Sequence, residues 1–245
     1  MGVMTTATPM PPAGRPVRLL IVDDDPLVRA GLTLMLGGAD DIDIVGEGAD
    51  GSEVAELVDR LRPDVVLMDI RMPVMDGLTA TEALRGRPDA PEVVVLTTFH
   101  ADEQVLRAIR AGAAGFVLKD TPPARIVDSV RRVAAGDPVL SPAVTRQLMA
   151  RAAGSGREER AGRAERARQR IALLADRERE VAVAVGHGRS NAEIAAALYL
   201  SVATVKTQVS RILAKFGFNN RVQIALLVHD AGLLDNEDED GASLS

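Results

Sequence analysis

The sequence predicts an α/β doubly wound domain with a five-stranded parallel sheet, followed by a small all-α domain of four helices. Three observations carry this prediction. In the first half of the chain, short aliphatic runs alternate with segments that have the apolar spacing of amphipathic helices. From residue 171 to residue 234 the spacing is helical throughout. Between these regions lies a stretch rich in Arg and Gly, which is typical of a connection between two domains.

The five aliphatic runs have the length and composition of buried parallel strands. Helical segments between such strands indicate βαβ units, and right-handed crossovers place the helices on both faces of the sheet. The predicted strands are 17–22, 42–45, 65–68, 93–96 and 115–118, and the predicted helices are approximately 26–36, 51–60, 77–85, 102–111 and 122–135.

The regions outside the two domains differ from them in composition. Residues 1–16 lack the apolar centre of a signal peptide and predict a disordered lead. The stretch 151–170 carries seven Arg and three Gly with almost nothing large and apolar, which predicts a mobile linker. The predicted regions are a lead at 1–16, the α/β domain at 17–136, a linker at 137–170, the helical domain at 171–234 and an acidic tail at 235–245.

Start and stop signals divide the helical domain into four helices. Asp176 is predicted to cap the first, Ser190 or Asn191 the second and Ser201 the third, which ends at Gly217. Only three residues join the second helix to the third, which predicts a helix-turn-helix. The predicted helices are approximately 176–185, 192–198, 202–216 and 221–231.

The composition excludes several classes of function. Aromatic residues make up only 2% of the chain and there is no Trp, which argues against binding of single-stranded nucleic acid by base stacking. The absence of Cys excludes disulfides and thiolate metal sites, and the three His are widely scattered. No apolar run approaches the roughly 20 residues of a membrane span. We therefore expect a cytoplasmic protein that makes no membrane contact.

Charge is distributed unevenly along the helical domain. The net charge is −6, yet no acidic residue lies between Glu193 and Asp230. That interval contains Lys206, Arg211 and Lys215. A basic stripe suits contact with DNA, but charge alone fits a solvated face equally well.

Polar residues follow four of the predicted strands. In an open α/β sheet, ligands bind beyond the carboxyl ends of the strands, so these side chains are expected to meet at one edge. Clustered carboxylates with no nearby His or Cys favour a hard cation such as Mg²⁺. An Asp, a Mg²⁺ site, a Lys and a hydroxyl together suit phosphoryl transfer to a carboxylate. The residues are Asp23, Asp24 and Asp25 after the first strand, Asp69 after the third, Thr97 after the fourth and Lys119 after the fifth.

The motifs at these strand ends resemble the receiver domain of two-component response regulators, which has a flavodoxin-like fold. They are RLLIVDDDPLVR at 18–29, VVLMDIRMPVMDG at 65–77, VVVLTTF at 93–99 and GAAGFVLKD at 112–120. The resemblance covers nearly all of residues 17–136. It implies that Asp69 is the phosphoacceptor and that Mg²⁺ binds Asp23, Asp24, Asp69 and the backbone carbonyl of Arg71. It also implies that Thr97, Phe116 and Lys119 are the switch and phosphoryl-binding residues.

One departure from the receiver pattern leaves an alternative open. Asp25 stands where the most similar subfamily often has His, so the chain offers a third acid beside the expected pair. The register of the strand favours Asp23 and Asp24 as metal ligands, and Asp25 remains the alternative.

The second domain resembles the LuxR-type helix-turn-helix of the NarL/FixJ response regulators. The matching segments are LADRERE at 174–180, SNAEIA at 190–195 and SVATVKTQVSRILAKF at 201–216. Gln208 stands where His is frequent and Ala175 where Thr is frequent, and we expect Asp176 to replace the missing cap. The resemblance implies that Lys206, Thr207 and Ser210 face DNA, with Arg211 and Lys215 nearer the phosphates.

Together the two resemblances imply a DNA-binding transcriptional regulator controlled by phosphorylation, not an enzyme beyond self-phosphorylation and self-dephosphorylation. The implied partners are a sensor histidine kinase, double-stranded DNA, RNA polymerase and a second copy of the chain upon phosphorylation or DNA binding. Activation by release of a docked helix-turn-helix and activation by dimerisation both stay open. Two rival functions are a phosphatase in which Asp23 is the nucleophile, and a regulator whose C-terminal helices bind a protein.

Overall fold

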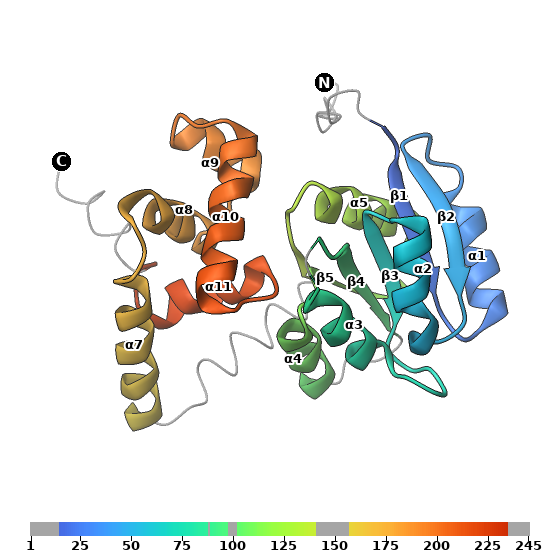
Figure 1. Ribbon diagram of the computed structural model, residues 1–245, viewed down its shortest axis with the longest axis horizontal. Helices are drawn as coiled ribbons and strands as arrows, with labels where there is room; N and C mark the ends of the chain where they lie inside the picture. The colour runs from blue at the N-terminus through green and yellow to red at the C-terminus, as the bar shows by residue number, and fades with distance from the viewer. Residues whose placement is uncertain (1–14, 88, 98–101, 141–156, 235–245) are drawn as a thin grey trace, which may run out of the picture.

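A computed structural model describes residues 15–87, 89–97, 102–140 and 157–234 (Figure 1). It confirms an α/β domain with a parallel sheet followed by a helical domain. Most of the predicted lead, the central part of the predicted linker and the whole acidic tail lie outside the described residues. None of the described helices is long and apolar enough to span a membrane.

The sheet contains the five predicted strands and one short addition. Every pair of neighbouring strands is parallel, and the spatial order is β2-β1-β3-β4-β5-β6. The order turns at β1 and β3, which is where a doubly wound sheet places its ligand site. The strands are β1 (Val17–Val22), β2 (Ile42–Gly48), β3 (Val65–Asp69), β4 (Glu92–Thr97), β5 (Gly115–Leu118) and the two-residue β6 (Val139–Leu140).

Helices cover both faces of the sheet, as right-handed crossovers require (Figure 1). Helices α1 (Pro26–Leu36) and α5 (Pro123–Ala134) pack on one face. The other face carries α2 (Val54–Leu61), which follows a short 3₁₀ turn, α3 (Gly77–Arg85) and α4 (Asp102–Ala111).

Alternation along each strand divides the core into two layers. In β1, Leu20 and Val22 face the layer under α2–α4, whereas Leu19 and Ile21 face the layer under α1 and α5. Both faces are apolar because successive side chains of a strand point to opposite sides of a sheet that is covered twice. The polar residues of this domain are therefore concentrated at the strand ends and in the loops.

The helical domain contains the four predicted helices around its own core. Ser190, Ser201 and Asn220 cap three of them through their side-chain oxygens, and Gly217 ends α10 with a left-handed backbone. The capping choice between Ser190 and Asn191 is thus resolved for Ser190. The helices are α8 (Asp176–Gly186), α9 (Asn191–Ala197), α10 (Val202–Phe216) and α11 (Arg221–Asp230).

The prediction of a mobile linker through residue 170 is wrong for its last part. Residues 157–171 form helix α7 (Arg157–Ile171), and Ala167 and Ile171 lie in the core of the helical domain. The Arg170 guanidinium lies 5.0 Å from the ring centroid of Phe216 and donates a hydrogen bond to its carbonyl oxygen at 2.9 Å. Arg and Ala are good helix formers, so a segment that looks like a spacer by charge becomes a helix once an apolar surface is available.

The predicted cap at Asp176 is also wrong. Ala175 occupies the N-cap position of α8, and Asp176 is the first helical residue. The Glu178 carboxylate accepts a hydrogen bond from the Ala175 backbone N–H at 3.0 Å, which is one half of a capping box. Glu178 therefore compensates for the Thr that is frequent at position 175.

Candidate phosphoacceptor and DNA-binding sites

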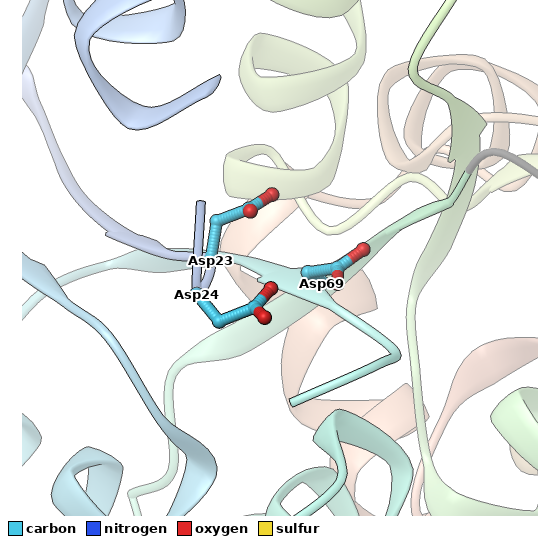
Figure 2. A group of neighbouring side chains, drawn as sticks. All are labelled: Asp23, Asp24 and Asp69. Carbon is cyan, nitrogen blue, oxygen red and sulfur yellow. The ribbon is translucent and has the colours of Figure 1, made fainter. Parts of the chain in front are cut away.

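Three carboxylates meet at the carboxyl end of the sheet. Asp23 and Asp24 follow β1, and Asp69 is the last residue of β3, the strand beside it. Each can offer an oxygen to a cluster whose ligand atoms all lie within 4.8 Å of one another. Figure 2 shows the Asp23, Asp24 and Asp69 side chains next to one another at the two strand ends. Asp23 and Asp69 are buried, whereas Asp24 is exposed and opens the cluster to solvent.

Lys119 connects two of these carboxylates. It follows β5, and its ammonium nitrogen lies 2.5 Å from Asp23 Oδ2 and 3.1 Å from Asp69 Oδ1. Its backbone N–H donates to the carbonyl of Thr97 at 2.8 Å, which fixes the end of β5 beside the end of β4. The structure thus brings together the acids, the hydroxyl residue and the lysine that the strand ends predict.

The Lys119 ammonium does not balance the negative charge of the neighbouring carboxylates. Burial raises the pKa of the Asp69 carboxyl; nearby Lys119 lowers it, and the charge of Asp23 raises it further. Burial lowers the pKa of the Lys119 ammonium, but its close contacts and charge interactions with Asp23 and Asp69 outweigh that effect and leave the pKa raised. One ammonium therefore faces more negative charge than it neutralises.

A divalent cation fits this cluster. Asp23 Oδ2 is fully buried and has no hydrogen-bond partner of acceptable angle, although the Lys119 ammonium lies close to it. Among the described residues the cluster consists of three carboxylates, which match the oxygen preference of Mg²⁺. A cavity of about 430 Å³ beside Asp24 and Arg71 gives the cluster an opening to solvent.

Asp25 has a different position from the other two N-terminal acids. Its carboxylate accepts a hydrogen bond from the Leu27 backbone N–H at 2.8 Å and caps α1. Its own backbone N–H donates to Asp23 Oδ1 at 3.0 Å. The geometry therefore groups Asp23 and Asp24 with Asp69 and gives Asp25 a capping role.

The loop after Asp69 is held in place by two further residues that motif reasoning did not use as site residues. The Asp50 carboxylate accepts hydrogen bonds from the backbone N–H groups of Val74 at 2.9 Å and Met75 at 3.2 Å. Gly77 lies so near the strand end that a β-carbon there would come within 1.8 Å of the Asp69 carbonyl oxygen. These contacts fix the direction in which the chain leaves the cluster.

Arg71 and Phe116 occupy less expected positions. The Arg71 backbone N–H donates to Asp69 Oδ2 at 3.1 Å. Phe116 is already buried in the core layer under α2–α4. The switch role that the resemblance implies for Phe116 therefore starts from a ring that lies in the apolar core.

Helix α10 presents the residues that are predicted to face DNA on its exposed side. Lys206, Thr207, Ser210 and Arg211 are exposed, whereas Val205 and Ile212 are buried in the domain core. Lys215 is exposed in part, but its ammonium lies 2.5 Å from a Glu178 carboxylate oxygen and also reaches the Leu173 carbonyl at 3.3 Å. Lys215 is thus paired with a carboxylate of its own domain.

The two domains contact each other through the turn that precedes α11. The buried Asn220 side chain donates two hydrogen bonds to main-chain carbonyls of the α/β domain, at 2.8 Å to Ile109 and 2.9 Å to Ala113. Arg85 donates in return to the Asn219 carbonyl at 2.6 Å, and Val222 joins the core layer under α2–α4. The sequence did not predict this interface, because its hydrogen bonds go to main-chain carbonyls at helix ends, which no particular residue type marks.

A second part of the interface involves the end of α5. Arg221 donates to the Asp137 carboxylate at 3.1 Å and to the Gly136 carbonyl at 3.2 Å. The Asn191 backbone N–H donates to the same carboxylate at 3.0 Å. Lys206 lies beside this contact, since a β-carbon on Gly136 would be 3.9 Å from the Cε of Lys206. Lys206, which is predicted to face DNA, therefore lies next to the α/β domain.

Comparison with known proteins is consistent with this geometry. The family model of the response regulator receiver domain matches residues 19–131, and that of bacterial regulatory proteins of the luxR family matches residues 172–228. The transcriptional regulatory protein LiaR of Bacillus subtilis is 35% identical over 213 residues, covering 87% of this chain and 97% of LiaR. The response regulator protein VraR of Staphylococcus aureus is 34% identical over 218 residues, covering 89% of this chain and 99% of VraR. A crystal structure of a LuxR-family response regulator from Aurantimonas is 30% identical, with a TM-score of 0.53, covering 56% of this chain and 97% of that one.

Proposed function

Because the chain belongs to the two-component response regulators that join a receiver domain to a LuxR-type DNA-binding domain, we propose that Asp69 accepts a phosphoryl group from a sensor histidine kinase and thereby controls DNA binding. The family consists of DNA-binding transcription regulators and not of catalytic enzymes, so the phosphatase alternative is dropped. The proposed site of action is the cytoplasm.

The observation that carries the assignment of Asp69 is its place at the centre of the cluster. Like Asp23, it contacts Lys119 and belongs to the possible metal-binding group, but it alone of the three acids ends β3, the strand between β1 and β4. Its oxygen forms a bond to phosphorus as the bond to the kinase imidazole breaks, and the electron pair of that bond stays on the imidazole. Mg²⁺, held by Asp23, Asp24, Asp69 and the Arg71 carbonyl, supplies positive charge for the phosphoryl oxygens.

Lys119 and Thr97 act on the phosphoryl group in this proposal. The Lys119 ammonium already lies 3.1 Å from Asp69 Oδ1, where it can neutralise a phosphoryl oxygen. Thr97 ends the neighbouring strand, and it is the residue of β4 that carries a hydroxyl. A new anion that draws Thr97 and Lys119 together repositions the ends of β4 and β5.

The proposed output is the release of a docked helix-turn-helix. In the present arrangement Lys206 borders the receiver, and Asn220 is bonded to the end of α4. A DNA duplex placed on the Lys206, Thr207, Ser210 and Arg211 face would approach this contact, so docking and full groove entry compete. Dimerisation on paired half-sites remains compatible with release, because freed domains can then bind together.

The test of the phosphoacceptor uses a matched control. Incubation with Mg²⁺ and acetyl phosphate, followed by mass mapping, should place the phosphoryl group on Asp69 and should show no modification of Asp69→Asn. Asp25→Asn is the control, since Asn also caps helices well and should leave labelling intact. Full labelling of Asp69→Asn would refute the assignment.

A further inference from the structure

Tyr199 combines an unfavourable backbone conformation with an unusually exposed side chain. It lies in the turn between α9 and α10 with a left-handed φ of 55°. Its residue surface is 95% exposed, although an aromatic ring normally contributes to a core or an interface. Left-handed backbone is costly for a residue with a β-carbon and rare for a bulky one. The backbone conformation of Tyr199 is therefore unfavourable, and its exposed ring buries too little surface within the chain to offset that.

Other helix ends in the same protein show what the turn alone requires. The Leu200 N–H donates to the Ala195 carbonyl at 2.9 Å, which is the six-to-one hydrogen bond of a Schellman motif. That motif needs a left-handed backbone at the residue directly before the donor, which here is Tyr199. Among the described helices, five others end with the same bond, and the left-handed residue is glycine in every one. These glycines are Gly112, Gly136, Gly188, Gly217 and Gly232.

The neighbours of Tyr199 already provide the packing that the turn needs. Leu198 and Leu200 on either side are partly buried against the core of the helical domain. The Ser201 side chain then accepts a hydrogen bond from the Thr204 N–H at 3.0 Å and begins α10. Glycine or asparagine at position 199 would serve this local structure better than tyrosine, so the ring points to a function outside the chain.

The position of the turn indicates which partner the ring meets. In a helix-turn-helix the second helix enters the major groove with its first residues while the helix before it crosses the backbone. The turn between them lies at the edge of the groove, beside the sugar–phosphate chain. No acidic residue lies between Glu193 and Asp230, and the N-terminus of α10 adds a partial positive charge.

We propose that Tyr199 contacts the sugar–phosphate backbone of duplex DNA, its hydroxyl donating to a phosphate oxygen and its ring packing on the deoxyribose. Tyrosine hydroxyls are among the side-chain donors that bind phosphates and set the orientation of a protein on the duplex. The contact is sequence-independent and positions α10 for base reading. It rests on the proposed function, in which α10 is the helix that enters the groove.

The composition of the chain gives this proposal a direct probe. Tyr199 is the only Tyr and there is no Trp, so tyrosine emission reports on position 199 alone. The full-length protein, activated with Mg²⁺ and beryllium fluoride, is titrated with a random-sequence duplex, with free N-acetyltyrosinamide as the control for absorption by DNA. The emission change should have the same midpoint as the anisotropy change of a labelled duplex.

Two variants separate a binding role from a folding role. Tyr199→Asn tolerates left-handed backbone, so it should raise the Tm slightly while weakening binding about tenfold. Tyr199→Phe keeps the ring and should weaken binding about fivefold, the effect of losing one typical hydrogen bond. Neither change should alter the slope of affinity against salt, because no charge is removed.

The outcomes distinguish this inference from the proposed function. If wild-type protein binds DNA while its tyrosine emission stays constant, or if Tyr199→Asn binds as tightly as wild type, the contact is refuted and the recognition role of α10 stands. An emission change that requires RNA polymerase or a second copy of the chain in place of DNA also refutes it. If the wild type binds no duplex, both the proposed function and the contact fail.

Discussion

The acidic site and the domain interface lie at opposite ends of the same sheet and are built from different chemical groups. Asp69 and Lys119 stand where strands end, so the site consists of charged side chains delivered by β1, β3 and β5. The interface lies where strands begin, and Asn220 and Arg221 there bind main-chain carbonyls at the ends of α4 and α5. The first arrangement leaves a motif in the sequence, whereas the second leaves almost none.

This difference bears on how a signal crosses the receiver. Helices α4 and α5 and strand β5 run between the two ends of the sheet. Phe116 in β5 and Val222 from the DNA-binding domain belong to the same apolar layer. A packed layer transmits a shift because it has few alternative arrangements. Variants at either end therefore test whether the two regions are coupled or only share a domain.

The largest effect is expected at the charged end. Asp24→Ala should weaken Mg²⁺ binding at least about tenfold, because it removes one carboxylate from a hard-cation site. Asp25→Ala should change Mg²⁺ affinity little and lower the free energy of unfolding by about 1 kcal/mol through loss of the α1 cap. Metal titration followed by calorimetry or NMR measures the first, and thermal unfolding the second. The reverse ranking for Mg²⁺ would place Asp25 in the metal site.

At the interface end, Asn220→Asp removes the docking hydrogen bonds with almost no change in side-chain size. Aspartate still caps α11, since the oxygen that accepts from Gln223 at 3.0 Å is retained. It loses both donor bonds to Ile109 and Ala113 and faces two carbonyls with a negative charge. DNA affinity of the unphosphorylated protein should rise about tenfold, as expected for 1–2 kcal/mol of lost docking energy. An unchanged affinity in a gel-shift titration would mean that docking does not limit DNA binding.

Lys206 and Lys215 form a matched pair on one helix. Lys206→Ala should weaken binding to DNA and reduce the salt slope by about one counterion. Lys215→Ala should act first on folding, lowering the free energy of unfolding by about 1 kcal/mol, because its ammonium is paired with Glu178. Affinity at several salt concentrations and thermal unfolding separate the two effects. Equal salt slopes for wild type and Lys206→Ala would remove Lys206 from the set of phosphate or base contacts.

A smaller effect concerns the loop that follows the phosphoacceptor. Hydrogen bonding by the Ser52 backbone N–H, with those of Val74 and Met75, lowers the pKa of Asp50 to about 2. A depressed carboxyl pKa adds stability above its unfolded value, near 4, that is lost as the pH falls through about 2. Asp50→Asn should therefore have a lower Tm at neutral pH, and its Tm should converge with that of wild type as the pH approaches 2. Parallel Tm curves across this range would contradict the role of the Asp50 charge.

Much of this architecture could be predicted from sequence, and the exceptions share a physical cause. The strands, the helix-turn-helix and the meeting of Asp23, Asp69 and Lys119 follow from periodicity and from the geometry of parallel strands. Helix α7 was missed because its apolar contacts come from another part of the domain. The Asn220 contact was missed because its acceptors are carbonyls, which every residue carries.

In the proposed mechanism, phosphorylation at Asp69 undocks the DNA-binding domain from the opposite end of the receiver. Hydrogen exchange of full-length protein, with and without Mg²⁺ and beryllium fluoride, tests it most directly at residues 109–113 and 219–223. Release predicts that both segments lose protection together in the activated state and that Asp69→Asn abolishes the change. Protection that stays constant at both segments while DNA affinity rises would contradict release and would assign activation to dimerisation of a docked chain.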